Sequence, residues 1–169
     1  VELGISDSGS GSKFVSTHPD QDSLSFVSRK ASYSLKDYVI EAEEVDEILV
    51  ADAAIYPGDG SVTVETGAIM RSFKGASILV NRDKSYHELF DADVTIYGGK
   101  SYAGRASVNY KGRGVDEQLI RFDSLYVDSV YQSVGIGTIN PDRGFKFNPQ
   151  FSYKGSVKME GSMKEFYYD

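Results

Sequence analysis

The sequence lacks cysteine and tryptophan altogether, and its 169 residues include only two histidines and three methionines. Without cysteine, neither a disulfide framework nor a thiolate metal site can form, and cysteine usage says nothing about the compartment. Without tryptophan, no indole ring is present to stack on a sugar. These absences remove disulfide-stapled scaffolds and cysteine-ligated zinc modules from the classes to consider.

Positive charge is also in deficit, since 18 lysines and arginines face 25 acidic residues and the net charge is −7. Such a chain repels phosphate backbones, so nucleic acid is not expected as a partner. No apolar run reaches the roughly 18 residues of a membrane-spanning helix, and residues 1–5 lack the basic and apolar regions of a signal peptide. Because the chain also starts without methionine, we expect a fragment of a longer protein.

The residues that are plentiful favour β-strands. The chain has 12 tyrosines and 9 phenylalanines with many valines and isoleucines, which are the residues enriched in strands. Turn sequences rich in glycine, proline and asparagine lie at residues 56–60, 98–99, 111–114, 140–144 and 154–155,. The runs between them have strand length and alternate, as in residues 61–65, 94–97, 102–110 and 119–127. The sequence therefore predicts an all-β fold: a stacked antiparallel β-sandwich, an open β-jellyroll or a solenoid-like segment.

The length corresponds to about one domain. The glycine- and serine-rich stretch at residues 7–12 indicates that residues 1–23 form a flexible N-terminal segment or linker,. Residues 24–169 are then the β-rich domain, either as one unit or as two small stacked units at about 24–97 and 98–169.

Residues 38–53 allow two interpretations. Apolar residues recur at spacings of four, three, four and four, which would line one face of a helix,. However, the segment is acidic throughout and has no basic residue to form i,i+4 pairs or to meet the C-terminal helix dipole. We therefore expect two strands, at residues 38–45 and 48–56, joined by a turn at Asp46 and Glu47.

A short unit, alanine followed two residues later by a large apolar residue, recurs six times along the chain. The first and third residues of a strand point to the same side, so a small and a large side chain could stack layer upon layer inside a narrow sheet structure. The simpler interpretation is chance, because alanine and valine are common and the spacing is irregular. The predicted interior ladder consists of Tyr33, Tyr56, Met70, Ile78, Val94 and Val108.

The main stretch with a family resemblance is residues 26–45, continuing through residues 48–57. This stretch resembles the repeated β-rich domain of very long cell-envelope proteins of Gram-negative bacteria. Further stretches that fit are residues 86–87, 92–98, 102–104 and 145–155, so that the resemblance covers roughly residues 24–158. It implies an extracytoplasmic location, in the periplasm or at the outer membrane and cell surface, and it implies no assigned activity.

The alternation of alanine and tyrosine with valine- and isoleucine-rich strands is also similar, more distantly, to the repeats of the lipopolysaccharide-transport bridge proteins. That resemblance consists of spacing and residue class, and it implies an open β-jellyroll. It adds lipid to the partners to consider, beside other envelope proteins and neighbouring segments of the same long chain.

Catalytic motifs are incomplete. Residues 86–91 begin like the zinc-binding helix of a metalloprotease, but Asp91 stands where the second histidine is needed after His87,. The other histidine, His18, lies in a distant polar stretch, so a zinc site is not expected. Residues 9–11 do not complete a serine-hydrolase elbow, and residues 135–140 lack the helix that a dinucleotide loop requires.

Carboxylates are the remaining candidates for chemistry. As strand residues, Glu41 and Glu43 would share one face and Glu44 and Asp46 the other, each pair about 7 Å apart, within the range that glycosidases use. A solvated acidic face is the preferred interpretation. Residues 7–10 and 20–23 offer oxygen ligands for calcium, but neither stretch has the closing glutamate of a calcium loop,.

The leading hypothesis is therefore a non-catalytic structural or interaction module of a large envelope assembly, without a cofactor. The alternative is a lipid conduit with an open apolar interior, and the third is an acid-pair glycosidase.

Overall fold

The computed structural model describes residues 2–3 and 11–169, and it confirms the all-β fold. The only helices in these residues are two short 3-10 turns, η1 (Pro19–Gln21) and η2 (Pro141–Arg143). The strands are β1 (Glu2–Leu3), β2 (Ser12–Val15), β3 (Ser25–Ser34), β4 (Val39–Val50), β5 (Ala53–Tyr56), β6 (Val62–Val64), β7 (Met70–Val80), β8 (His87–Gly98), β9 (Ser101–Tyr110), β10 (Gln118–Val127), β11 (Ser133–Ile139), β12 (Lys146–Asn148), β13 (Phe151–Ser152), β14 (Gly155–Glu160) and β15 (Tyr167–Tyr168).

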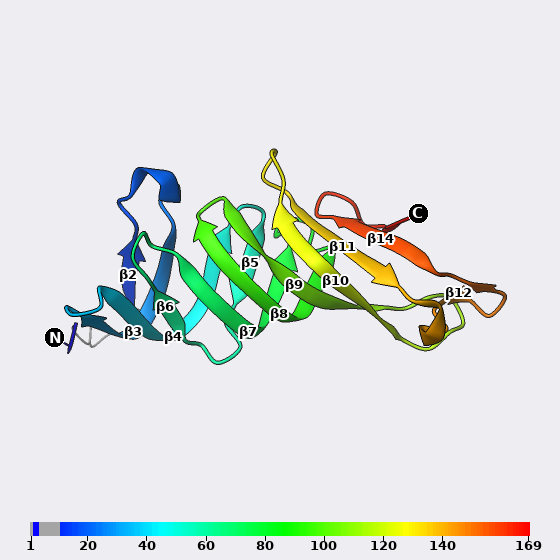
Figure 1. The fold of residues 1–169 in the computed structure, drawn as a ribbon, viewed down its shortest axis with the longest axis horizontal. Coiled ribbons are helices and arrows are strands. Elements are labelled where there is room, and N and C mark those ends of the chain that lie inside the picture. Colours follow the sequence, from blue (N-terminus) through cyan, green and yellow to red (C-terminus); the bar gives the residue numbers. More distant parts are fainter. Residues whose placement is uncertain (1, 4–10) are drawn as a thin grey trace.

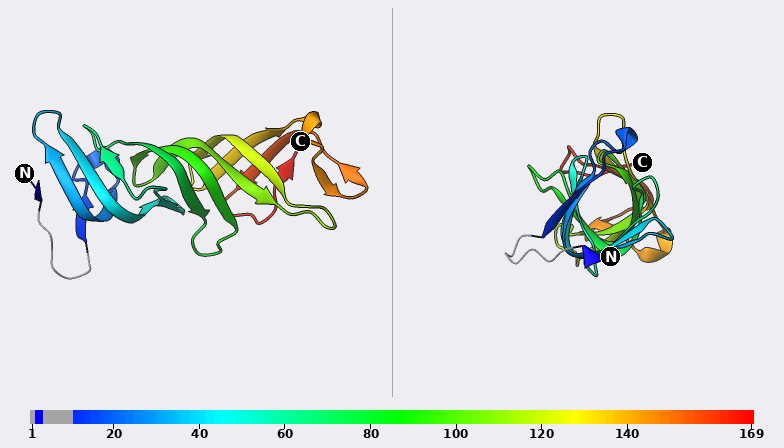
Figure 2. Two further views of the ribbon diagram at one scale, coloured as in Figure 1. Left: turned by 90° about the horizontal axis from the view of Figure 1, so that it is seen from below. Right: turned by 90° about the vertical axis from the view of Figure 1, so that its left-hand side faces the viewer.

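Thirteen of these strands form one antiparallel sheet that follows the chain order. Its path is β1-β3-β4-β5-β7-β8-β9-β10-β11-β14-β15, with β2 on β3 and β6 on β4 and β7, while β12 and β13 form a separate hairpin. The molecule is long and narrow (Figure 1). Viewed along the long axis, the strands surround that axis, so the sheet is curled rather than open (Figure 2).

The turn-rich stretches lie where the sequence predicts them. Gly98 ends β8, and β9 begins at Ser101, which confirms the glycine hairpin. Residues 111–117 connect β9 to β10, and residues 140–145 connect β11 to β12 through η2. Short tight connections are what allow consecutive strands to pair as neighbours.

The structure bears on two boundaries of the expected organisation. Residues 12–15 of the predicted linker form β2, which pairs with β3 in the main sheet. The remainder of its glycine- and serine-rich stretch, at residues 7–10, lies outside the described residues. The sheet also continues across residues 97–98, where β8 pairs with β9, and one apolar core spans both halves. The described part of the chain is therefore one unit.

The predicted turn at Asp46 and Glu47 is wrong, although the preference for strand over helix is confirmed. β4 runs unbroken from Val39 to Val50, and the chain reverses at residues 51–52 instead. Inside β4, Glu44 has a positive φ of 55°, and the pairing register with β3 shifts between Phe26 and Ser28. The register shift corresponds to a β-bulge, which adds a residue to β4 without ending the strand,.

These two irregularities also explain the helix-like spacing of the sequence. Ala42, Val45 and Ile48 are all buried at intervals of three residues, while the residues between them are exposed. A regular strand buries every second residue, but a bulge adds one residue to the outward side. A bulged strand can therefore show the apolar spacing of a helix.

The curled sheet meets itself along a line of contacts between turns and strand ends that are not neighbours in the sheet. The amide of Ala51 donates to the carbonyl of Gly99 (2.9 Å), and the amide of Gly99 donates to that of Gln21 (2.8 Å). Further along, the side chain of Asn81 donates to the carbonyl of Gly161 (2.9 Å). We call this line the seam, and its residues are Gln21, Ala51, Asp52, Asn81, Gly99, Ser133 and Gly161.

Candidate functional site

The structure places most of the predicted ladder inside the curled sheet. Met70, Ile78, Val94 and Val108 are buried and belong to the single apolar core. Tyr33 is only partly buried. The four buried members of the ladder come from β7, β8 and β9, so the interior ladder runs over the middle of the sheet.

The prediction that Tyr56 points into the interior is wrong, because its side chain is 37% exposed on the outer side of β5. Ala53 and Ile55 are fully buried members of the core instead. Side chains two residues apart share a face, so the inward unit of this strand starts at Ala53 rather than Ala54.

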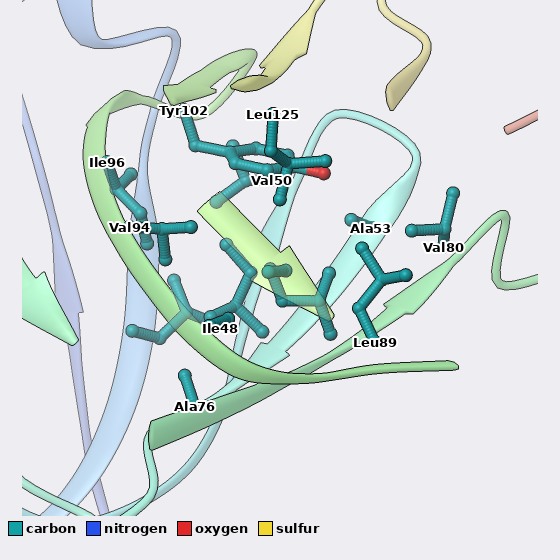
Figure 3. Close-up of a cluster of buried hydrophobic side chains, with 14 of the residues drawn as sticks. Ile48, Val50, Ala53, Ala76, Val80, Leu89, Val94, Ile96, Tyr102 and Leu125 are labelled. Atoms are coloured by element: carbon teal, nitrogen blue, oxygen red, sulfur yellow. The ribbon is translucent and has the colours of Figure 1, made fainter. Parts of the chain in front are cut away.

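The interior of the curled sheet is filled by side chains. Ile48, Ile78, Leu89, Ile96 and Phe122 come from four different strands, and each has no exposed surface. Figure 3 shows such a cluster, with side chains from the surrounding strands pointing toward one another. Small barrels typically have interiors just wide enough for side chains to fill.

Three polar side chains form a buried network at the seam. The Oδ1 of Asp52 accepts hydrogen bonds from the amide (3.0 Å) and the hydroxyl (2.5 Å) of Ser133. The hydroxyl of Ser133 also lies 2.6 Å from that of Tyr102. Asp52 follows β4, Tyr102 lies on β9 and Ser133 begins β11, so the network ties together three separate parts of the sheet.

This network joins separate parts of the sheet at the seam. Ser133 and Tyr102 have essentially no exposed surface. Burial is the main reason that the pKa of Tyr102 lies well above its usual range. In the sequence Asp52 is one of several neighbouring acidic residues. No local pattern marks Tyr102 or Ser133 as its partners, because the pairing depends on how the sheet curls.

The candidate acid pair lies on the outside of the molecule. Glu41, Glu43, Glu44 and Asp46 are all exposed, so the predicted alternation of these carboxylates between two faces is wrong. The left-handed backbone at Glu44 interrupts the regular alternation, so Glu43 and Glu44 both point outward.

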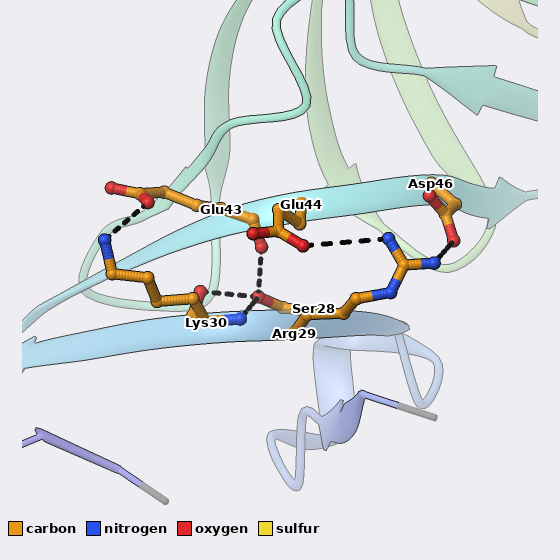
Figure 4. Close-up of polar contacts among 6 residues, drawn as sticks. All are labelled: Ser28, Arg29, Lys30, Glu43, Glu44 and Asp46. Atoms are coloured by element: carbon orange, nitrogen blue, oxygen red, sulfur yellow. Dashed lines mark hydrogen bonds and ion pairs between the residues drawn. The ribbon is translucent and has the colours of Figure 1, made fainter. Parts of the chain in front are cut away.

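Most of these carboxylates are paired with basic residues of β3 (Figure 4). Lys30 contacts Glu43 at 2.8 Å, and Arg29 contacts Asp46 at 2.9 Å and Glu44 at 3.8 Å. Exposed pairs of this kind add little stability, typically below about 1 kcal/mol. The structure thus confirms the solvated acidic face.

The two stretches considered for calcium provide no cluster of ligands in the described residues. Asp22 carries the carboxylate that would be needed, but it forms an ion pair with Lys100 at 3.0 Å. The described residues contain no group of three or more histidine or acidic side chains arranged to hold a metal ion. Residues 7–10 lie outside the described part of the chain.

His87 lies under the C-terminal segment rather than in a metal site. Its side chain is buried, its Nε2 lies 2.7 Å from the carbonyl oxygen of Met163, and its ring stacks on Phe166 with centroids 5.0 Å apart. Burial lowers the pKa of His87, and this outweighs the backbone hydrogen bond and the charge of Glu165, which raise it. The neutral imidazole is therefore the form that holds this segment in place.

Acidification is expected to destabilise the protein through His87. Because the folded-state pKa lies below the unfolded value of about 6.5, the protein loses stability as the pH falls below about 6.5. The replacement His87→Phe keeps a ring against Phe166 and removes the titration. Urea denaturation at pH 7.5, 6.5 and 5.5 should show a smaller loss of stability for this variant than for the wild type.

The matched control is His18→Asn, because His18 is exposed and is the only other histidine. This variant should keep the pH dependence of the wild type. An identical acid response in wild type and His87→Phe would contradict the assignment to His87.

Comparisons with protein-family models, curated proteins and solved structures find no match to this chain. Among the described residues, no helix has the length and apolarity needed to cross a membrane.

Proposed function

We propose that this chain is a non-catalytic structural and interaction module of a larger assembly in the bacterial cell envelope. The observation that carries the proposal is the continuous packed core, which extends from Phe26 on β3 to Met159 on β14. A filled interior leaves function to the outer surface and to the two ends of the sheet.

The ends of the sheet are suited to association. Among the described residues, β2 pairs only with β3 and β15 only with β14, so each strand has an unpaired edge. Unpaired strand edges offer amide and carbonyl groups to another chain. Both edge strands are short, which limits unselective pairing and favours defined partners.

The envelope location rests on the resemblance of residues 24–158 to repeated domains of long envelope proteins. On this basis the expected partners are other envelope proteins or neighbouring segments of the same long chain.

The burial pattern argues against the alternative of a lipid conduit. A conduit needs an apolar slot that runs along the interior, yet Ile55, Ile78 and Ile96 have no exposed surface. Opening such a slot would require moving close-packed side chains apart. The third candidate, a glycosidase, would need its acid pair to face a cleft, but Glu41 and Glu43 project into solvent.

Photo-methionine provides a test, because the three methionines sample three environments. Met159 is fully buried in the core, Met163 is 40% exposed, and Met70 lies at the N-terminal end of the interior. The protein is produced in envelope-containing cells with photo-methionine, irradiated and analysed by mass spectrometry. Protein adducts at Met163, with only intramolecular adducts at Met159, are the expected result.

Lipid adducts at Met159 would reject the structural module and establish the conduit. Absence of any protein adduct at Met163 would remove the support for a partner at this end. Replacing Met163 by leucine serves as the control, since it should abolish the protein adducts and leave those at Met159 unchanged.

A further inference from the structure

The interior of the curled sheet has an apolar opening at its N-terminal end. A pocket of 110 Å³ is lined mainly by Phe14, Val15, Phe26, Ile40, Val64 and Met70, from strands β2, β3, β4, β6 and β7. The rings of Phe14 and Phe26 stack at 5.1 Å and form one wall. An engineered cavity of about 150 Å³ binds benzene, so this pocket is of the right order for one aromatic ring.

The opposite end of the molecule carries an exposed aromatic residue. Phe151, on the hairpin of β12 and β13, is 67% exposed. The turn before it is fixed, because the Oδ1 of Asn148 accepts hydrogen bonds from the amides of Gln150 (2.9 Å) and Phe151 (3.0 Å). Figure 1 shows β12 at the far end of the long axis from β2. A ring held on a fixed turn loses little entropy when it docks.

The charges of the two ends are complementary. Residues 1–65 contain 13 acidic and 4 basic residues, whereas residues 141–158, around the hairpin, contain one acidic and 4 basic residues. Opposite charges on two docking surfaces steer them together and fix their orientation.

We propose that Phe151 of one copy fills the N-terminal pocket of a second copy, so that the molecules associate head to tail. The contact is heterologous, because the surface that docks differs from the surface that receives it. Such a contact leaves a free pocket at one end and a free hairpin at the other, and open chains result. This inference rests on the proposed function in one respect: both require that the two ends of the molecule are accessible to a partner.

Sedimentation velocity of the full chain at increasing concentration tests the proposal. The wild type should form dimers and longer species, and these should weaken as the salt concentration rises because part of the attraction is electrostatic. The variants Phe151→Ser and Val15→Asp should each weaken association about 30-fold or more, the effect typical of losing a central anchor. Val15 is 52% exposed at the rim of the pocket, so the substitution leaves the core intact.

Mixing the two variants gives the sharpest result. Phe151→Ser retains a good pocket and Val15→Asp retains a good hairpin, so the mixture should form one-to-one dimers that grow no further. Val130→Asp is the matched control, since Val130 is 65% exposed on the turn between β10 and β11. This control should associate like the wild type.

A wild type that stays monomeric at millimolar concentration would overturn the proposal, as would unchanged association of Phe151→Ser. Saturable binding of oleate that Val15→Asp abolishes, without any self-association, would also overturn it and assign the pocket to an acyl chain. None of these outcomes changes the photo-methionine result at Met159, so failure of the docking and failure of the structural module are distinguishable.

Discussion

Replacement of Phe122 by alanine is expected to destabilise the protein by about 3–5 kcal/mol, the usual cost of removing a buried aromatic ring. Phe122 lies on β10 with no exposed surface. Its ring lies against Gly135, where an added Cβ would sit 2.9 Å from Cγ of the ring, and its centroid is 6.1 Å from that of Phe166. The neighbours therefore already fit the ring closely and can collapse only partly into the cavity.

Urea denaturation followed by tyrosine fluorescence or circular dichroism gives the change in the free energy of unfolding. Phe151→Ala is the matched control, because it removes the same side chain from an exposed site and should change stability by less than about 0.5 kcal/mol. Equal effects of the two substitutions would mean that the interior around Phe122 is not packed.

Replacement of Asp52 by alanine is expected to cost about 2–3 kcal/mol. The substitution removes the acceptor of both the amide and the hydroxyl of Ser133, and a buried donor without a partner costs about 1–3 kcal/mol,. Thermal or urea denaturation measures the loss. Asp59→Ala is a suitable control, since the exposed Asp59 accepts only a local hydrogen bond from Ser61.

A double-mutant cycle distinguishes the network from a general effect of charge. Ser133→Ala should destabilise the wild type but cost clearly less in the Asp52→Ala background, because the shared hydrogen bonds are already lost. Strict additivity of the two substitutions would contradict a seam held together by this network.

The sequence supports the local features of the fold. Alternation and turn composition predict β6, β9 and β10 nearly to the residue, because a strand between two tight turns is specified by its own residues,. In β4 the same reasoning places a turn wrongly, since the bulges turn Asp46 and Glu47 outward and imitate the composition of a loop.

The contacts by which the curled sheet meets itself could not be predicted from local sequence patterns. Asp52 and Ser133 lie 81 positions apart in the chain, and their contact depends on the curl accumulated over all the strands between them. The N-terminal pocket likewise combines residues from Phe14 to Met70 that share no local pattern. Sheet curvature depends on twist and bulges at many positions, and no single motif encodes it.

The most direct test of a filled interior uses a nitroxide-labelled fatty acid and the methyl groups of the isoleucines in NMR spectra. Ile48, Ile55, Ile78, Ile96 and Ile120 sample the interior along the sheet, and all are at most 1% exposed. If side chains fill this space, their methyl signals should keep their intensity at a fatty-acid concentration that broadens the exposed Ile136. Broadening of the five interior signals together would show an acyl chain inside the curled sheet and would contradict the account.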